Sequence, residues 1–192
     1  MFSWDTSGEM AIQTERLLLR TPRRGDLTAL DTAIRETLDE LVLWLPWARP
    51  GHKRADTRQY LRHARVARSH RSAFEFLLAR PDTEEVCGMA SLHRIDWLRR
   101  SAGIGYWVRR GAWGQGIATE AGHALVTEAF RVLELYRIEA HVATENKSSQ
   151  RVIEKLGFHR EGVARGVEFV NGRYLDHIQY GLLRTDLAET RR

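Results

Sequence analysis

The sequence predicts an α/β (α+β) domain, because alternating apolar runs typical of strands are interspersed with segments whose apolar residues recur at helical spacing. The most informative stretch runs from Ile104 to Ala129, where a short strand, a glycine-bearing turn and a long amphipathic helix follow one another. At 192 residues and 43% hydrophobic composition, the chain can bury one sizeable core, so we expect a single domain.

The chain divides into a leader, one domain and a short tail. Residues 1–13 are expected to be a loose leader, with Met10 as an alternative start to Met1, residues 14–184 form the domain, and residues 185–192 form the tail. Apolar runs predict strands, which span residues 14–20, 73–79, 85–93, 104–108, 137–143, 158–163 and 176–183. Apolar stripes predict helices, which span residues 27–41, 56–71, 117–133 and 146–157.

Local signals support several of these boundaries. Asp26 is placed to cap the first helix, and Asn146 is placed to cap the fourth. Gly157 is typical of a helix end, because glycine adopts the left-handed conformation that closes a last turn. Asn171-Gly172 is a strong signal for the turn of a hairpin.

The composition argues against several classes of protein. No apolar run approaches the roughly 20 residues that span a bilayer, and no secretion signal is visible, so we expect no membrane association. The one cysteine, Cys87, cannot form an internal disulfide and lies in an apolar run, which predicts a buried thiol in a reducing, cytoplasmic compartment. The eight histidines show no metal-ligand spacing, so we predict no metal site.

The charge favours anionic partners. A net charge of +5 and an isoelectric point near 9.8 suit phosphates, an acidic polypeptide or RNA. One face of the helix over 56–71 is heavily basic, and its arginines are Arg58, Arg62, Arg65, Arg68 and Arg71. Such a face is most often only solvated, but it could also attract an acidic substrate.

The glycine turn predicts a phosphate site. Gly111, Gly114 and Gly116 precede a helix, whose first amide N–H groups and positive dipole end attract phosphate oxygens. Such a turn can also be only a tight connection. A mononucleotide P-loop is excluded, because Ile117 and Ala118 stand where that motif needs Lys and Ser/Thr.

The turn resembles a known family. The stretch from Trp113 to Ala118, WGQGIA, is similar to the acetyl-CoA pyrophosphate loop of the GNAT N-acetyltransferases, which usually reads Gln/Arg-x-x-Gly-x-Gly/Ala, although Trp113 stands where Gln or Arg is usual. Its continuation Ala-Thr-Glu-Ala resembles the RimL/RimJ branch, the ribosomal-protein N-terminal acetyltransferases. The segment from Asn146 to Phe158 resembles the GNAT pattern that ends in Leu-Gly-Phe, and Glu-Phe-Val-Asn-Gly from Glu168 resembles the RimL hairpin.

This resemblance implies a fold and a cosubstrate. The GNAT fold has a mixed, mostly antiparallel central sheet of six to seven strands flanked by helices on both faces. The cosubstrate would be acetyl-CoA, with no metal, and the backbone N–H of Val108 would stabilise the oxyanion. The residues expected to bind acetyl-CoA are Trp107, Val108, Trp113, Gly114, Gln115, Gly116, Ile117, Ala118, Thr119, Asn146 and Ser149.

The resemblance also implies catalytic roles. Many GNAT enzymes carry a general-acid tyrosine where this chain has Ile153, and the RimL/RimJ branch assigns that role to the serine that matches Ser149. Glu168 matches the proposed base of the branch, and it would act directly or through water. From the residues alone, Glu168 could equally be a turn residue and Ser149 a second capping residue.

The acceptor is expected to bind between aromatic side chains. Trp44 and Trp47 lie in an irregular stretch that is either packing over the core or an acceptor wall, and Tyr106 and Glu168 would complete the wall. The leading prediction is acetyl transfer to the α-amine of a protein N-terminus of the ribosomal serine/alanine type. A small amine, such as an aminoacyl antibiotic or nucleotide, is the alternative acceptor. A non-catalytic CoA-sensing or RNA-binding module is the alternative class. We expect no direct nucleic-acid binding by an enzyme of this type, and a homodimer stays open.

Overall fold

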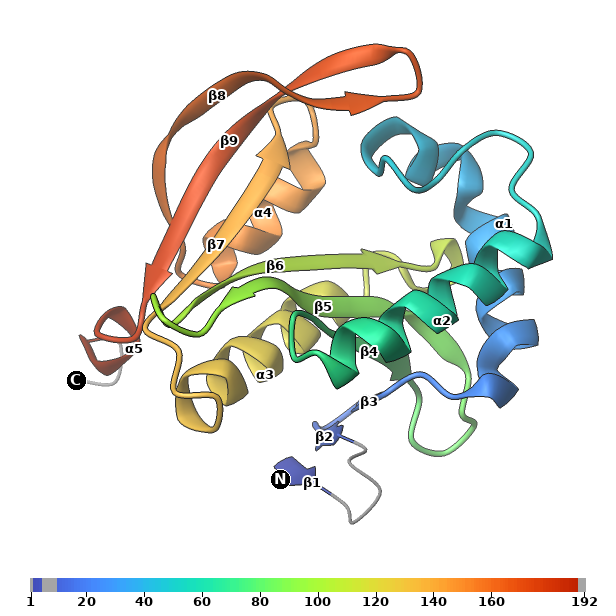
Figure 1. The fold of residues 1–192 in the computed structure, drawn as a ribbon, viewed down its shortest axis with the longest axis horizontal. Coiled ribbons are helices and arrows are strands. Elements are labelled where there is room, and N and C mark those ends of the chain that lie inside the picture. The colour runs from blue at the N-terminus through green and yellow to red at the C-terminus, as the bar shows by residue number, and fades with distance from the viewer. Residues whose placement is uncertain (1, 5–9, 190–192) are drawn as a thin grey trace.

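The computed structural model describes residues 2–4 and 10–189, which build one mixed sheet with helices on both faces (Figure 1). Its nine strands lie in the order β1-β2-β3-β4-β5-β6-β7-β9-β8. The strands are β1 (Phe2–Trp4), β2 (Met10–Gln13), β3 (Leu18–Arg20), β4 (Phe74–Ala79), β5 (Val86–Asp96), β6 (Ser101–Val108), β7 (Arg137–Ala143), β8 (His159–Val170) and β9 (Arg173–Leu183). All pairs are antiparallel except β6 with β7, as predicted for a mixed, mostly antiparallel sheet.

Five α-helices and two short 3-10 helices complete the part of the chain that the structure describes. They are α1 (Leu27–Trp44), α2 (Arg54–Ser69), α3 (Ile117–Arg131), α4 (Lys147–Lys155), α5 (Asp186–Glu189), η1 (Arg24–Asp26) and η2 (Arg110–Ala112). Asp26 precedes α1 but does not cap it, because its carboxylate instead accepts hydrogen bonds from the Arg20 side chain and the Arg23 backbone. None of the helices in the described part of the chain is long and apolar enough to cross a membrane.

The leader prediction is wrong for residues 10–13. They form β2, which pairs with β3, and the side chains of Met10 and Ile12 are buried. Thr21 holds the strand in place, because its hydroxyl accepts a hydrogen bond from the Met10 N–H at 3.0 Å. β1 and β2 account for the two strands beyond the predicted maximum of seven. Residues 1, 5–9 and 190–192, including the Met1 start, lie outside the described residues.

Side-chain alternation divides the core into two layers. Phe74, Phe76 and Ile104 face α3 and α4, whereas Leu77 and Trp107 face α1 and α2. Each strand therefore buries both faces where helices cover it, which explains the nearly continuous apolar runs in β4 and β5.

The sheet splits between β6 and β7. Their parallel pairing covers only Ser101–Gly103 against Arg137–Glu139, and beyond it the two strands diverge (Figure 1). The edge of β6 from Ile104 to Val108 thus faces an opening rather than a neighbouring strand. This opening lies where the glycine turn, α4 and the last hairpin meet.

The last hairpin is longer than predicted. The segment expected to connect the strands over 158–163 and 176–183 is itself strand, because β8 and β9 stay paired up to Val170 and Arg173. Asn171 and Gly172 form the predicted turn, with φ of +45° and +92°. Phe169 and Tyr174 pack across the strands with ring centroids 4.9 Å apart.

Candidate active site

The glycine turn presents a row of free amide groups. Gly114 and Gly116 adopt left-handed backbone conformations, with φ of +72° and +76°, and Gly116 is the N-cap of α3. In the part of the chain that the structure describes, the backbone N–H groups of this turn and of the first residues of α3 donate to no protein group; they are those of Gly114, Gln115, Gly116, Ile117, Ala118 and Thr119. A run of unpaired N–H groups at a helix N-terminus suits an anionic ligand.

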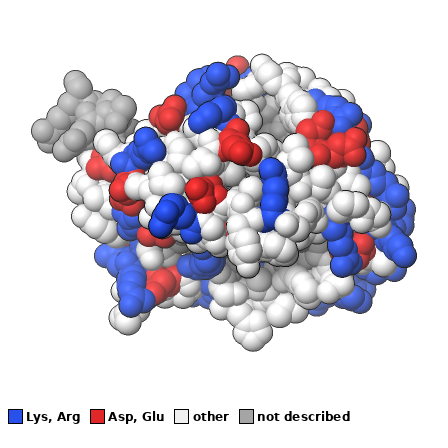
Figure 2. All heavy atoms as spheres, turned by 90° about the horizontal axis from the view of Figure 1, so that it is seen from above, with Lys and Arg blue, Asp and Glu red and all other residues white. Residues whose placement is uncertain are grey.

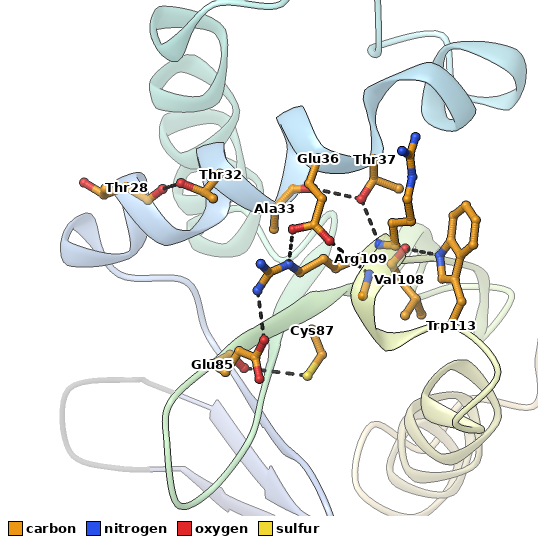
Figure 3. Close-up of polar contacts among 12 residues, drawn as sticks. Thr28, Thr32, Ala33, Glu36, Thr37, Glu85, Cys87, Val108, Arg109 and Trp113 are labelled. Atoms are coloured by element: carbon orange, nitrogen blue, oxygen red, sulfur yellow. Dashed lines mark hydrogen bonds and ion pairs between the residues drawn. The ribbon is translucent and has the colours of Figure 1, made fainter.

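Side chains from α1 hold this turn rigidly against the sheet (Figure 3). Glu36 accepts hydrogen bonds from Arg109 at 2.5 Å and from the Gly111 N–H at 3.0 Å. Thr37 accepts one from the Arg110 N–H at 3.0 Å. The Arg109 guanidinium is the largest influence on the Glu36 carboxyl and holds its pKa below the usual value. The turn is therefore positioned before any ligand binds.

Two arginines flank the turn and add positive charge. Arg16 donates to the Gln115 carbonyl at 2.8 Å and also pairs with Glu120. Arg80 donates to the side-chain oxygen of Gln115. An anionic ligand at the turn would therefore meet two guanidinium groups beside the amides.

The edge of β6 supplies backbone donors to the opening. Arg109 donates its N–H to the Cys87 carbonyl at 2.8 Å, so the preceding residue, Val108, directs its N–H and C=O away from β5. The Val108 carbonyl accepts a hydrogen bond from the Trp113 indole at 2.7 Å (Figure 3). Trp113 thus fastens the turn to the strand, and the Val108 N–H faces the opening.

A hydroxyl pair lies on the other side of the opening. Asn146 caps α4 by accepting a hydrogen bond from the Ser149 N–H at 3.1 Å, as predicted. The Ser149 hydroxyl lies 3.0 Å from the hydroxyl of Tyr106, which reaches it from β6. Burial raises the pKa of Tyr106, so its hydroxyl stays protonated. Ile153 is fully buried and packs in the core.

The acceptor wall joins two segments that are far apart in the sequence. The Asn171 side chain, at the tip of the hairpin, donates to the carbonyls of Val42 at 2.7 Å and of Ala48 at 2.9 Å. Trp44 packs on the cluster of Ala143, Val170 and Leu175, and the Arg173 guanidinium lies 5.7 Å from the centre of its ring. The hairpin therefore holds both the end of α1, which carries Trp44, and the loop after it, which carries Trp47.

The two tryptophans differ in their surroundings. Trp47 stacks on Tyr60 with ring centroids 5.9 Å apart, leaves 37% of its surface exposed, and lies 6.3 Å from Trp107. The sequence assigned Trp107 to cofactor binding, and the structure places its side chain behind the acceptor wall. Its side chain is buried under α1 and α2, and its residue pairs with Met89 of β5, so it supports the wall from behind.

Glu168 lies on β8, half-buried and directly opposite Leu175 of β9. Leu175 belongs to the cluster on which Trp44 packs, so Glu168 lies beside the acceptor wall. Leu175 also lines a cavity of about 200 Å³, together with residues that include Thr144, Arg173 and Asp176. Sequence reasoning placed Tyr106 in the acceptor wall and Asn171 in a turn, but it missed their contacts with Ser149 and with the loop after α1, because the partners of both are distant along the chain.

Other predicted features have simple structural explanations. Cys87 is buried, and burial raises the pKa of its thiol, so it is a core residue. No group of three metal-binding side chains occurs in the part of the chain that the structure describes. The α2 arginines are mostly exposed, and charges of both signs are scattered over the face shown in Figure 2.

Comparison with known proteins agrees with this geometry. The sequence of residues 16–159 matches the protein-family model of the acetyltransferase (GNAT) domain. The chain is 44% identical over 101 residues to YdaF of Bacillus subtilis, which is named provisionally as a ribosomal N-acetyltransferase; the match covers 53% of this chain and 55% of YdaF. The chain spans between 55% and 65% of the length of YdaF and of three other Bacillus relatives.

Two comparisons extend over nearly the whole chain. The chain is 28% identical to the ribosomal protein uS5-alanine N-acetyltransferase of Escherichia coli, over 93% of both proteins. The solved structure of RimL, the ribosomal L7/L12 α-N-protein acetyltransferase, in complex with coenzyme A has a TM-score of 0.85 and 25% identity; the match covers 90% of this chain and 97% of that one.

Proposed function

The chain belongs to the GNAT acetyltransferase family, and from this premise we propose that it transfers an acetyl group from acetyl-CoA to the α-amine of a protein N-terminus. The observation that carries the proposal is the opening between β6 and β7. It is bordered by the free amides of the glycine turn, the Tyr106–Ser149 pair and the hairpin that bears Glu168. The full-length similarity to the uS5-alanine enzyme supports this class of acceptor.

The glycine turn would bind the diphosphate of acetyl-CoA. Its unpaired N–H groups, with Arg16 and Arg80 beside them, match the charge and the hydrogen-bond demand of such a group. The turn lies at the end of β6, so a pantetheine arm leading from it would pass along the free edge of that strand. Backbone groups of Val108 and its neighbours would then hold the thioester in the opening.

The reaction needs a base, an oxyanion donor and an acid. Glu168 would take a proton from the acceptor ammonium, directly or through water, so that a neutral amine attacks the thioester carbonyl. The Val108 N–H would donate to the oxygen that becomes negative. Ser149 would donate its hydroxyl proton to the departing thiolate. The second proton that the amine nitrogen loses as the amide forms would return to Ser149 through the hydroxyl of Tyr106, which is hydrogen-bonded to it and ends the cycle protonated.

Two substitutions test the roles of these side chains. We expect Glu168→Gln and Ser149→Ala to lower kcat by about 100-fold or more, while acetyl-CoA binding, measured by calorimetry, is kept. Glu15→Gln is the matched control, because Glu15 is exposed and remote in sequence from these elements. Unchanged turnover in either active-site variant would remove that residue from the mechanism.

A substrate panel tests the acceptor class. Release of coenzyme A would be measured with peptides that begin with the N-terminal residues of ribosomal proteins and, in parallel, with aminoacyl compounds and polyamines. We expect the highest kcat/KM for a peptide, because the wall formed by Trp44, Trp47 and the hairpin offers extended contact area. A higher kcat/KM for any small amine would replace the peptide with that acceptor.

A further inference from the structure

The proposed reaction must dispose of a proton. At neutral pH the acceptor enters as an ammonium ion and leaves as an amide, while the thiolate takes up one proton, so one proton is released in each turnover. Glu168 would receive that proton first and must pass it on before the next cycle. The acceptor, bound against the wall beside Glu168, would obstruct direct release into solvent.

Two histidines lie next to Glu168 on the same face of the sheet. Leu175 is opposite Glu168, and His177, two residues further along β9, projects from the same face as Leu175. His177 is in turn opposite Ala143 of β7, and His141 lies two residues before Ala143 on that face. Glu168 and His177, like His177 and His141, are thus diagonal neighbours. Such residues lie roughly 7–8 Å apart, and one bridging water can connect the ends of their side chains.

Of the two rings, that of His141 is the more exposed. His177 is 8% exposed, whereas the side chain of His141 is 26% exposed. Within the described residues, neither ring forms a hydrogen bond to another side chain, so their nitrogens are free to exchange protons. The series therefore leads from the reaction site toward solvent.

Burial, more than the surrounding charges, keeps the two rings neutral at pH 7. Burial is the largest influence on His177 and lowers its pKa, while Glu168 and Asp176 act in the opposite direction and His141 lowers it further. A neutral imidazole accepts a proton on one nitrogen and releases one from the other, which suits it to a relay.

His141 has charged neighbours on three strands. Burial and Arg94 of β5 lower its pKa, as does Arg137 of β7, whereas Glu139 and Glu168 raise it. A carboxylate oxygen of Glu139 lies 4.0 Å from Nε2 of the His141 ring.

His93 of β5 approaches this series across β6. Gly103 and Gly105 leave room for its ring; a Cβ atom at Gly103 would lie only 2.6 Å from His93 Nε2. Burial, together with the charges of Arg94 and His141, lowers the pKa of His93 to about 4, so it is neutral and adds no positive charge to the face.

We propose that His177 and His141 form a proton outlet that carries the proton from Glu168 to solvent. This proposal rests on the proposed function, because it takes Glu168 as the base. Glu168 passes its proton to one nitrogen of His177, the other nitrogen of His177 releases a proton to His141, and His141 releases one to water. Glu168 is thereby returned to its carboxylate form, and both rings return to the neutral state.

Single substitutions test this outlet. We expect His177→Gln and His141→Ala to lower kcat about 5–10-fold, with KM for both substrates unchanged and the acidic limb of the pH–kcat profile displaced. Added imidazole should restore kcat in His141→Ala, because that position is open to solvent. His177→Asn and thermal melting of each variant separate this effect from loss of folding.

The control is His159→Gln, because His159 is an exposed histidine at the start of the same hairpin. It should leave kcat and the pH profile unchanged. An unchanged profile in both outlet variants, or a raised KM for the acceptor with an unchanged kcat, would overturn the outlet. If Glu168→Gln retained full turnover, the base assignment itself would fail; if that variant is inactive but the histidine variants match the wild type, only the outlet fails.

Discussion

The two sides of the opening are built in different ways. On the cofactor side, consecutive backbone amides of one short stretch form the binding surface, and Glu36 and Thr37 brace it from α1. On the acceptor side, side chains from the loop after α1 and from the hairpin meet only through contacts such as those of Asn171. The arrangement of the backbone amides on the cofactor side depends on the local conformation of one short stretch. The arrangement of the side chains on the acceptor side depends on how distant segments pack together.

This difference bears on specificity. Amides held by glycine conformations accept the same diphosphate whatever the neighbouring side chains are, so that side can stay constant while acceptors vary. The acceptor wall can change with a few substitutions in a loop, because loops tolerate variation better than the sheet beneath them. Substitutions that affect one side and leave the other intact therefore test the comparison.

The largest effect is expected for Gly116→Glu on the cofactor side. The residue would have to adopt φ near +76°, at a cost of about 1–2 kcal/mol for a non-glycine residue, and its carboxylate would repel a diphosphate. We expect the affinity for acetyl-CoA to fall by about 100-fold or more, measured by calorimetry. Gly25→Glu, in open space and at a negative φ, is the control, and normal affinity in Gly116→Glu would exclude the turn as the diphosphate site.

A smaller effect is expected for Asn171→Gly on the acceptor side. Glycine keeps the turn, because the position has φ of +45°, but removes both hydrogen bonds to the loop. Losing two such bonds, worth about 0.5–1.5 kcal/mol each, should raise KM for the acceptor about 5–150-fold without changing acetyl-CoA affinity.

Steady-state kinetics with a peptide acceptor measure this effect. Asn171→Asp, which also tolerates the left-handed conformation but cannot donate, should behave like the glycine variant. An unchanged KM for the acceptor in both variants would show that the hydrogen bonds of Asn171 do not shape the acceptor wall.

Tyr106→Phe examines the boundary between the two sides. The variant keeps the ring but removes the hydroxyl that lies 3.0 Å from that of Ser149. We expect kcat to fall about 3–10-fold, because one hydrogen bond contributes about 1 kcal/mol, with both KM values unchanged. Tyr136→Phe, on the exposed surface, serves as control, and a wild-type kcat in Tyr106→Phe would restrict the acid role to Ser149.

The smallest effect concerns the pH dependence of stability. Because burial lowers the pKa of His93 from 6.5 to about 4, the unfolded chain binds a proton in this window that the folded chain does not. The free energy of unfolding should therefore fall as the pH drops from 6.5 toward 4. His93→Gln should reduce that fall by about 1 kcal/mol at pH 5.5, measured by urea unfolding, and an identical pH dependence in the variant would contradict the buried, neutral state of His93.

Much of the architecture followed from local patterns. β7 begins and ends at the residues predicted from its alternation, and α4 begins after Asn146 as its capping signal indicated. The β2 strand was missed, because residues 10–13 are a strand only when β3 is there to pair with them. The place of the Trp107 side chain could not be predicted for a related reason, since its neighbours in the sequence do not show which face of the sheet it occupies.

By itself, the sequence determined the glycine turn, the strand before it, the helix after it and the cap of α4, because each depends on conformational preferences within a few residues. Only the tertiary structure decided that Tyr106 meets Ser149, that Asn171 holds the loop of Trp44, and that two histidines lie beside Glu168. These contacts depend on the order and register of the strands, which are set only when the whole sheet assembles.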